Sequence, residues 1–319
     1  MAGPRIEVVG GDVRAVDVDV LVLKWAQGPH GADEAVALAL REDSRALGLV
    51  PGEARAVQGA GRVGARTVLF LGAAPLTDLG YRELRSLATD LATAAAGTRA
   101  STVGLTLHGP GYGLDERECT RALLAGLLDA SEALAAGGTD VVRLIEADPR
   151  RGDVVRALVA DHVPGGVLAW DEVPAERRAR LAEAGPGSSE QPVAQVAMAM
   201  NGGTEDVFRQ GIEPVVHAAG LLCERQVPSG RDDLARTLAR LDRATVVVAD
   251  LTGGNPNVHL QLGYAWGRGI PTVVLVGAGE EARIVPFDGR AAADLAYRGI
   301  AGLRAGLPAV LARRTEGRA

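Results

Sequence analysis

Short apolar runs of strand length alternate with alanine-rich segments along almost the whole chain, and this alternation restricts the fold more than any other feature. In the first half the runs are IEVVGG, VDVLVLKW, ARTVLFLGA, STVGLTLHG and DVVRLIEAD, and segments 33–47, 81–97 and 115–136 have helical composition. Strands that alternate with helices form a largely parallel sheet covered on both faces. Residues 1–168 are therefore predicted to be one α/β domain.

A change of composition at residues 169–192 interrupts the alternation. The segment WDEVPAERRARLAEAGPGSSEQP begins as a short charged helix and ends in a cluster of Pro, Gly and Ser, which is typical of a linker. After it, VAQVAMAM, LLCERQV, TVVVAD and PTVVLVG supply strands between helical segments, and LAYRGIAGLRAGLPAVLARR supplies a last strand and helix. Residues 193–319 are therefore predicted to be a second open α/β domain.

The composition favours a cytoplasmic protein with no nucleic-acid partner. The chain has 319 residues, of which 47% are apolar, so it can bury two cores. Its net charge is −6, and its 34 basic residues are all arginine except Lys24, with no clustered basic surface of the kind that binds nucleic acids. Two cysteines about a hundred residues apart, Cys119 and Cys223, favour neither a disulfide scaffold nor a metal cluster.

No membrane association is expected either. The N-terminal MAGPRIEVVGGDV lacks the pattern of a signal peptide, and no apolar run reaches the roughly 18 residues of a membrane span.

The unusual residues of the second half fall at the ends of its predicted strands, where open parallel sheets bind their ligands. Met198, Met200 and Asn201 follow the first strand, and Asp250 ends TVVVAD. The next helix begins in the sequence NPNV, with Asn255 placed as its N-cap and Pro256 as its first residue. Such a helix start favours an anionic group, a phosphate or a carboxylate. An ordinary strand, turn and capped helix would have the same spacing.

Gln261 lies one turn further into this helix. It follows Asn257 by four residues and precedes Tyr264 by three, so the three side chains are predicted to share one side of the helix. His259 is not assigned to the site, because neighbouring helical positions point in different directions.

Three segments of the second half carry a family resemblance: QVAMAMNGGTEDVFRQGIEPVVHAAGLLCER, LARLDRATVVVADLTGGNPNVHLQLGYAWGRGIPTVVLV and IVPFDGRAAADLAYRGI. Together they resemble the nucleoside 2-deoxyribosyltransferase-like proteins, relatives of the TIR domains that cleave NAD. The resemblance implies a flavodoxin-like fold and N-glycosidic chemistry on a nucleoside or nucleotide. It also implies that Asp250 orients the substrate, that Asn255 and Asn257 form the site loop, and that Phe287 and Asp288 line the pocket wall.

Gln261 departs from this family, which has a glutamate immediately before LG. A carboxylate stabilises an oxocarbenium-like centre by its charge or by a covalent bond, and a neutral amide does neither well. Two explanations remain open. Gln261 is either the native residue of a protein that binds a nucleotide without cleaving it, or a Glu→Gln substitution that traps the substrate.

The first half resembles the macro domains and the macro-like N-terminal domain of leucyl aminopeptidases, in the segments VVGGDVRAVDVDVLVLKWAQG, TLHGPGYGLDERECTRALLAGLLDA and DVVRLIEADPRRGDVVRALV. The resemblance implies a ligand loop formed by Asp12, Gly109, Gly111, Tyr112 and Gly113, where glycines let the backbone approach a diphosphate. A tight turn has the same pattern. Lys24, Trp25 and Ala26 stand where ADP-ribose-binding members carry an asparagine-rich run.

These resemblances together predict a nucleotide N-glycosidase that hydrolyses NAD, with a macro-like domain that regulates it or binds an ADP-ribose-type signal. The combination fits a role as a bacterial immune effector that depletes NAD, an analogy of fold only. We expect a homo-oligomer, and no cofactor or metal beyond the nucleotide itself. A nucleotide sensor without activity and a nucleoside 2-deoxyribosyltransferase are the alternatives.

Overall fold

The computed structural model describes residues 3–25, 31–42, 48–73, 79–200, 202–225, 233–280 and 293–316. The chain folds into two compact units. Unit 1 consists of Met1–Pro110 and Glu116–Ser189, and unit 2 of Gly111–Asp115 and Glu190–Ala319. The segment that the composition suggests as a linker contains the helix α6 (Ala175–Glu183) and a short 3-10 turn, and it belongs to unit 1 as far as Ser189.

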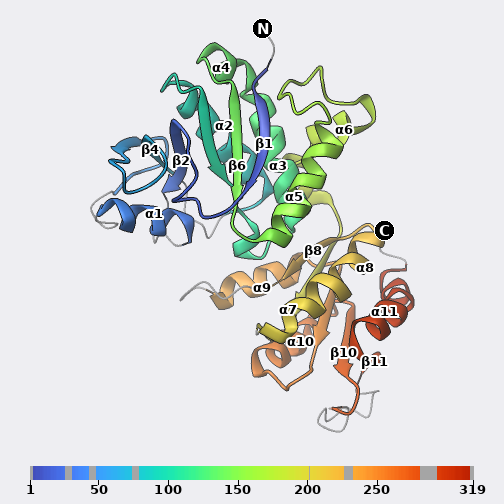
Figure 1. The fold of residues 1–319 in the computed structure, drawn as a ribbon. Coiled ribbons are helices and arrows are strands. Elements are labelled where there is room, and N and C mark those ends of the chain that lie inside the picture. Colours follow the sequence, from blue (N-terminus) through green and yellow to red (C-terminus); the bar gives the residue numbers. More distant parts are fainter. Residues whose placement is uncertain are drawn as a thin grey trace. The chain divides into compact units, whose positions relative to one another are not determined.

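Unit 1 is a six-stranded mixed sheet with helices packed on it (Figure 1). The strand order is β1-β6-β5-β2-β4-β3, and every described pairing is parallel except that of β3 with β4. The elements are β1 (Arg5–Gly10), β2 (Val20–Trp25), α1 (Ala32–Leu40), β3 (Ala54–Gln58), β4 (Thr67–Gly72), α2 (Tyr81–Ala96), β5 (Thr102–Thr106), α3 (Glu116–Asp129), α4 (Ser131–Ala136), β6 (Val141–Glu146), α5 (Pro149–His162) and α6 (Ala175–Glu183).

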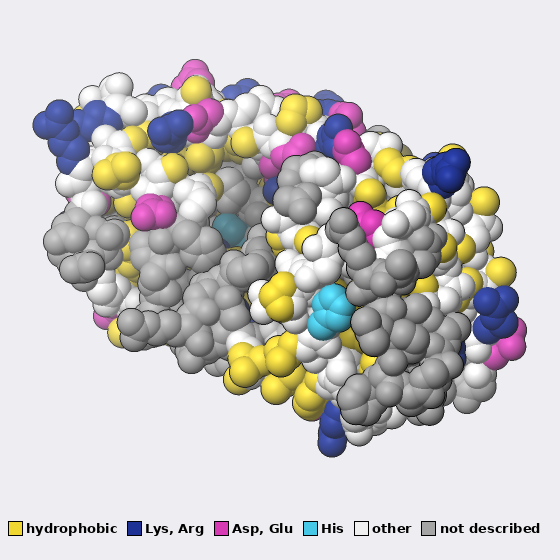
Figure 2. All heavy atoms as spheres, turned by 90° about the horizontal axis from the view of Figure 1, so that it is seen from below, with side chains coloured by type: hydrophobic (Ala, Val, Ile, Leu, Met, Phe, Trp, Pro, Cys, Tyr) yellow, Lys and Arg dark blue, Asp and Glu magenta, His cyan; other side chains and the backbone are white. Residues whose placement is uncertain are grey.

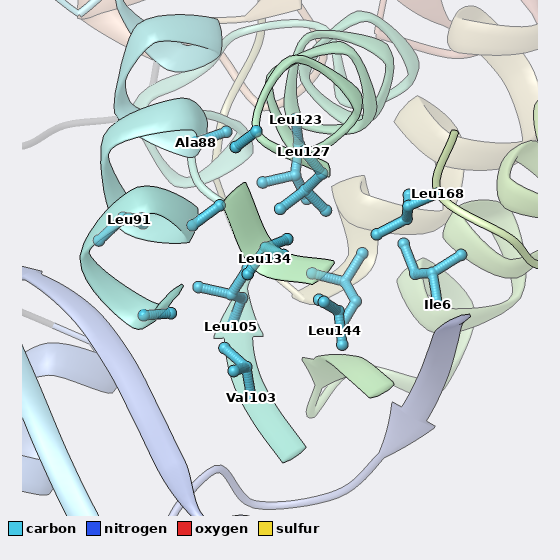
Figure 3. Packing of buried hydrophobic residues seen from close by; sticks show 14 of the residues in the cluster. Ile6, Ala88, Leu91, Val103, Leu105, Leu123, Leu127, Leu134, Leu144 and Leu168 are labelled. Atoms are coloured by element: carbon cyan, nitrogen blue, oxygen red, sulfur yellow. The ribbon is translucent and has the colours of Figure 1, made fainter. Parts of the chain in front are cut away.

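Both faces of this sheet are buried, which explains why its central strands read as continuous apolar runs. In β2, Val20 and Val22 belong to one core, whereas Leu21 and Leu23 belong to another. Figure 3 shows the first core, where leucines of α2 and α3 meet side chains of β5 and β6. The second core contains side chains of α1, and in it the rings of Trp25 and Phe70 meet edge to face at 5.2 Å.

Two local predictions for unit 1 need correction. The helix expected over 115–136 is two helices, because the Ser131 hydroxyl donates to the carbonyl of Leu128 at 2.7 Å where the chain turns. The antiparallel edge strand β3 was not predicted. Its residues are mostly exposed, so its sequence has no apolar run to indicate a strand.

Unit 2 is a five-stranded sheet with the order β11-β10-β9-β7-β8, and all of its pairings are parallel. This is the flavodoxin-like order 2-1-3-4-5, so the α/β prediction for both halves is confirmed. The elements are β7 (Val193–Ala197), α7 (Gly202–Asp206), a π-helical turn (Val207–Ile212), α8 (Glu213–Ala218), β8 (Leu222–Arg225), α9 (Asp233–Arg243), β9 (Val246–Asp250), α10 (Pro256–Gly267), β10 (Thr272–Gly277), β11 (Leu295–Tyr297) and α11 (Gly299–Thr315).

Alternation along β9 again distributes side chains between two faces. Val246 and Val248 pack with the apolar side chains of α8 and α11, whereas Val247 and Ala249 face α9 and α10. The helical segment before β8 contains a π-helical turn that ends at Ile212, directly before Glu213 and Pro214. Proline has no N–H to donate within a helix, and a π turn accommodates such an interruption.

The edge strand β8 is covered by residues 111–115, which explains why this short segment belongs to unit 2. The outward N–H groups of β8 donate to it: that of Cys223 to Asp115 Oδ2 at 2.8 Å, and that of Arg225 to the Gly113 carbonyl at 3.0 Å. A Cβ at Gly113 would lie 1.9 Å from the Arg225 carbonyl, and Gly113 has a φ of +85°. Glycine therefore permits this close approach, and the edge of the sheet is protected from further pairing.

The described surface shows no concentration of positive charge on the face in Figure 2, where Lys and Arg side chains are scattered among acidic and apolar ones. None of the described helices is long and apolar enough to cross a lipid bilayer. Within the described ranges, no three His, Cys, Asp or Glu side chains are grouped so that they could hold a metal ion.

Candidate functional site

The strand order of unit 2 places a topological switch point between β7 and β9. From β7 the chain crosses to β8 on one side and then returns to β9 on the other. Open α/β sheets bind ligands in the crevice beyond the carboxyl ends of the strands at such a point. The residues that follow β7 and β9 are the ones that the sequence assigns to the site.

Asp250, the last residue of β9, is buried and held by three donors. Its Oδ1 accepts from the Thr252 hydroxyl at 2.5 Å and from the Thr252 backbone N–H at 3.0 Å, and its Oδ2 accepts from the Tyr297 hydroxyl at 2.8 Å. The Thr252 hydroxyl in turn accepts from the backbone N–H of Gly277 at 2.8 Å. These bonds connect the ends of β9, β10 and β11, so Asp250 holds this edge together.

The Tyr297 hydroxyl stays protonated in this arrangement. Burial, and after it the negative charge of Asp250, raise the pKa of Tyr297 far above its usual value. Tyr297 therefore donates a hydrogen bond to Asp250. Because its two oxygens accept hydrogen bonds from three donors, the Asp250 carboxylate is placed to orient neighbouring groups.

The loop after β9 leads into α10 as the sequence predicts. Gly253 and Gly254 have φ values of +77° and +67°. Asn255 is the N-cap, its side-chain oxygen accepting from the N–H of Asn257 at 2.9 Å, and Pro256 is the first helical residue. The side chain of Asn257 is exposed. His259 is also exposed, with Nδ1 2.9 Å from the Asn255 carbonyl oxygen, so it belongs to the cap.

Gln261 lies on the buried side of α10, where 5% of it is exposed. Its neighbours on that side, Val258 and Leu262, pack against Ala197, Ala249 and Leu251 at the ends of β7 and β9. The carbonyl oxygen Oε1 of Gln261 is buried and has no hydrogen-bond partner among the described residues. An unsatisfied buried acceptor costs about 1–3 kcal/mol, so a donor from a ligand, from water or from a residue outside the described ranges would stabilise this atom.

The other predicted residues of unit 2 are placed as follows. Met198 is buried in the core, and Met200 is 43% exposed. The Tyr264 hydroxyl donates to both carboxylate oxygens of Asp242 on α9 at 3.0 Å, so it is engaged away from Gln261. Asn201, Phe287 and Asp288 lie outside the described residues.

Thr252 and Tyr297 extend the site that sequence reasoning outlined. Thr252 and Tyr297 were not identified from the sequence. The signal for Thr252 was its position two residues after Asp250, a spacing at which a hydroxyl reaches a carboxylate. No local sequence pattern identified Tyr297, because its hydrogen bond to Asp250 forms only when β9 and β11 take their places in the sheet.

The predicted ligand loop of unit 1 is divided by the structure. Asp12 is exposed and paired with Arg14, and this bonding lowers the pKa of Asp12 to about 2. Gly109 has a φ of +108°, and a Cβ there would lie 2.4 Å from the Cys119 sulfur. Gly111 has open space around it, and Tyr112 is buried. Gly111, Tyr112 and Gly113 all belong to unit 2.

Two histidines of unit 1 are expected to make its stability depend on pH. Burial lowers the pKa of His108 and of His162 from 6.5, and the charge of Lys24 lowers that of His108 further. Below about pH 6.5 the unfolded chain therefore takes up protons that the folded unit does not. The free energy of unfolding of unit 1 therefore decreases as the pH is lowered. The slope approaches about 1.4 kcal/mol per pH unit for a histidine that is protonated in the unfolded chain and stays neutral in the folded unit. Urea unfolding at pH 7.5 and 5.5 measures it, and a His108→Gln, His162→Gln double variant should give a flatter profile.

No protein-family model matches the chain, and no curated protein matches it. Solved structures similar to its N-terminal part are macro domains. A mutant of the Oceanobacillus iheyensis macrodomain is 16% identical with a TM-score of 0.40, over 48% of this chain and 90% of that one. The macro domain of ganglioside induced differentiation associated protein 2 is 18% identical with a TM-score of 0.41, over 49% and 83%. The Trypanosoma brucei macrodomain in complex with ADP is 22% identical with a TM-score of 0.41, over 49% and 69%. Similarity this low assigns no ligand to this chain.

Proposed function

We propose that unit 2 binds a nucleoside or nucleotide, with NAD as the first candidate, at the carboxyl ends of β7 and β9. In this proposal the chain, with Gln261 in place, binds the nucleotide without cleaving it. The ends of these two strands lie at a switch point, where sheets of this order bind their ligands. The resemblance of NPNVHLQLGYA to the nucleoside 2-deoxyribosyltransferase-like proteins supports the choice of ligand.

The observation that carries the proposal is the buried carbonyl oxygen of Gln261, which has no hydrogen-bond partner in the part of the chain that the structure describes. It can accept a hydrogen bond from a ribose hydroxyl or from the amide of a nicotinamide group. Asp250 is less available for this contact, because its two oxygens already accept three hydrogen bonds. A ligand that donates to Gln261 removes the cost of the buried acceptor, and this gain adds to its affinity.

Calorimetric titration with NAD, adenosine and deoxyadenosine tests the proposal. We expect binding by the chain as it is, and a loss of roughly 1–3 kcal/mol, or about 5- to 150-fold in affinity, for Gln261→Leu, which has a similar size but no acceptor. Tyr264→Phe is the matched control, because the Tyr264 hydroxyl is engaged with Asp242. If none of the three compounds binds, or if Gln261→Leu binds as well as the original chain, the proposal is wrong.

Hydrolysis of NAD is the second candidate function, and the position of Gln261 favours it. A glutamate at this buried position would bring a carboxylate to the crevice, the group that N-glycosidic chemistry needs. We expect Gln261→Glu to release nicotinamide from NAD and the original chain to release none. A Gln261→Glu protein that folds and binds NAD but releases no nicotinamide would exclude hydrolysis and leave nucleotide binding as the proposed function. Base release from deoxynucleosides only when a second base is present would favour a deoxyribosyltransferase.

A regulatory role for unit 1, an immune-effector role and a homo-oligomeric state belong to the same proposal. They follow from the resemblances described above. Light scattering of the full chain with and without NAD tests the oligomer.

A further inference from the structure

Lys24 is the only lysine of a chain whose other basic residues are all arginine, and it is buried, with 3% of it exposed. Arginine serves as the cation everywhere else in this chain. A lysine at this one position supplies a compact ammonium group with a primary amine, which arginine cannot supply.

The amine of Lys24 has a buried counter-ion. Lys24 is the fifth residue of β2, and its Nζ forms an ion pair with Asp33 Oδ2 on the first turn of α1. The side chains of both residues are 3% exposed. The carboxylate of Asp33 can therefore stabilise a positive charge on the nitrogen of Lys24, whether that nitrogen is an ammonium or another cation.

A neutral base lies within electrostatic reach of this pair. His108 follows β5, the neighbour of β2 in the sheet, and its imidazole is neutral because burial and the charge of Lys24 lower its pKa. The ring nitrogen Nε2 is buried without a hydrogen-bond partner among the described residues. Thr106, the last residue of β5, is 7% exposed, and its hydroxyl is likewise unpartnered. Two buried polar groups thus remain available to a ligand.

The chain path through the unit 1 sheet changes direction between β2 and β5, which makes this a switch point. From β2 the chain passes through α1 and β3 to β4 on one side, and from β4 it crosses through α2 to β5 on the other. Lys24, Thr106 and His108 lie at the carboxyl ends of β2 and β5, between which the direction changes. Ligands of open sheets bind at such ends.

We propose that Lys24 forms an imine with the aldehyde group of a small hydroxylated aldehyde, such as a pentose in its open-chain form. The amine is the nucleophile, Asp33 the counter-ion of the product, and His108 the proton carrier. The polar groups of Thr106 and His108 select hydroxylated aldehydes over apolar ones. This site lies in unit 1 and does not depend on the function proposed for unit 2.

The reaction needs no oxidant or reductant. A hydroxyl group of the bound aldehyde relays a proton from the Lys24 ammonium to His108 Nε2, which has no hydrogen-bond partner among the described residues. The freed lone pair of Nζ then attacks the carbonyl carbon. The carbonyl oxygen takes up the second proton of the nitrogen, which gives a carbinolamine. The imidazolium of His108 then protonates its hydroxyl, water leaves, and the C–N bond becomes double. The iminium carries the charge that the ammonium carried, so its pairing with Asp33 is retained.

Reductive trapping tests the proposal on the full chain. D-ribose or ribose 5-phosphate is added at pH 7.5 with sodium cyanoborohydride, which reduces an imine to a stable secondary amine, and peptide mass spectrometry locates the adduct. We expect the adduct at Lys24, formed at least tenfold faster than at the N-terminal amine. Urea-unfolded chain should lose this preference. Faster trapping with the phosphorylated sugar identifies it as the better substrate.

Three comparisons separate the imine from a merely structural lysine. Lys24→Arg, which keeps the ion pair, should give no adduct in this segment. His108→Gln should retain Lys24 and trap at least tenfold more slowly, with an unchanged circular dichroism spectrum. Butanal should react more slowly than ribose. Modification of the N-terminal amine alone, or equal rates at Lys24 in folded and unfolded chain, would overturn the proposal.

Discussion

Replacement of Asp115 by alanine is expected to lower the free energy of unfolding of unit 2 by about 3 kcal/mol. Asp115 is 1% exposed, and its Oδ2 accepts from the Cys223 backbone N–H at 2.8 Å and from His217 Nε2 at 2.6 Å. Alanine leaves both donors buried without this acceptor, at about 1–3 kcal/mol each. It also opens the edge strand β8.

Urea unfolding of the full chain measures the loss of stability. Hydrogen exchange in peptides of β8 shows whether the loss arises at this strand. Asp115→Asn is the matched control, because its amide oxygen keeps one acceptor at the same place. We expect it to lose less than half as much stability as Asp115→Ala. A change of less than about 0.5 kcal/mol in Asp115→Ala would be typical of an ordinary surface position and would contradict this view of the edge.

The fold class could be predicted from the sequence because both sheets are buried on two faces. Strands such as VLVLKW and TVVVAD then appear as unbroken apolar runs between helices. The same reasoning fails for β3, whose exposed residues carry no such pattern. It also fails for residues 111–115, since pairing of Gly113 with Arg225 connects positions more than a hundred residues apart.

The candidate site was predicted where the signal was local. Asn255 was identified as a cap because capping depends on residues within one turn, and Asp250 was identified because it ends an apolar run. Tyr297 and the engagement of Tyr264 with Asp242 could not be predicted. Both depend on which strands and helices become neighbours, which periodicity within one segment does not determine.

The role of Lys24 could not be predicted from the sequence for the same reason. Its position was noted because it departs from the asparagine-rich run of the macro domains. Its meaning depends on Asp33 from α1 and His108 from β5, which only the fold brings together.

Replacement of Asp250 by alanine is expected to destabilise unit 2 by about 3 kcal/mol and to abolish nucleotide binding. The Tyr297 hydroxyl, the Thr252 hydroxyl and the Thr252 N–H all lose their acceptor, and hydrogen bonds to a charged group contribute about 1.5–3 kcal/mol each. Partial replacement by water at the loop reduces the sum. Urea unfolding and calorimetric titration with NAD measure the two effects.

Tyr297→Phe decides whether Asp250 orients the loop or acts on the substrate directly. This variant keeps the carboxylate and removes one donor at 2.8 Å, so it should cost about 1.5–3 kcal/mol in stability. If Asp250 orients the loop before α10, the affinity for NAD should fall in Tyr297→Phe together with the stability, and Thr252→Val should behave alike. If the carboxylate itself binds the nucleotide, Tyr297→Phe frees one of its oxygens, and the affinity should stay the same or rise while the stability falls. The bonding of both oxygens favours the first result, because a carboxylate with three protein donors has little left to offer a ligand.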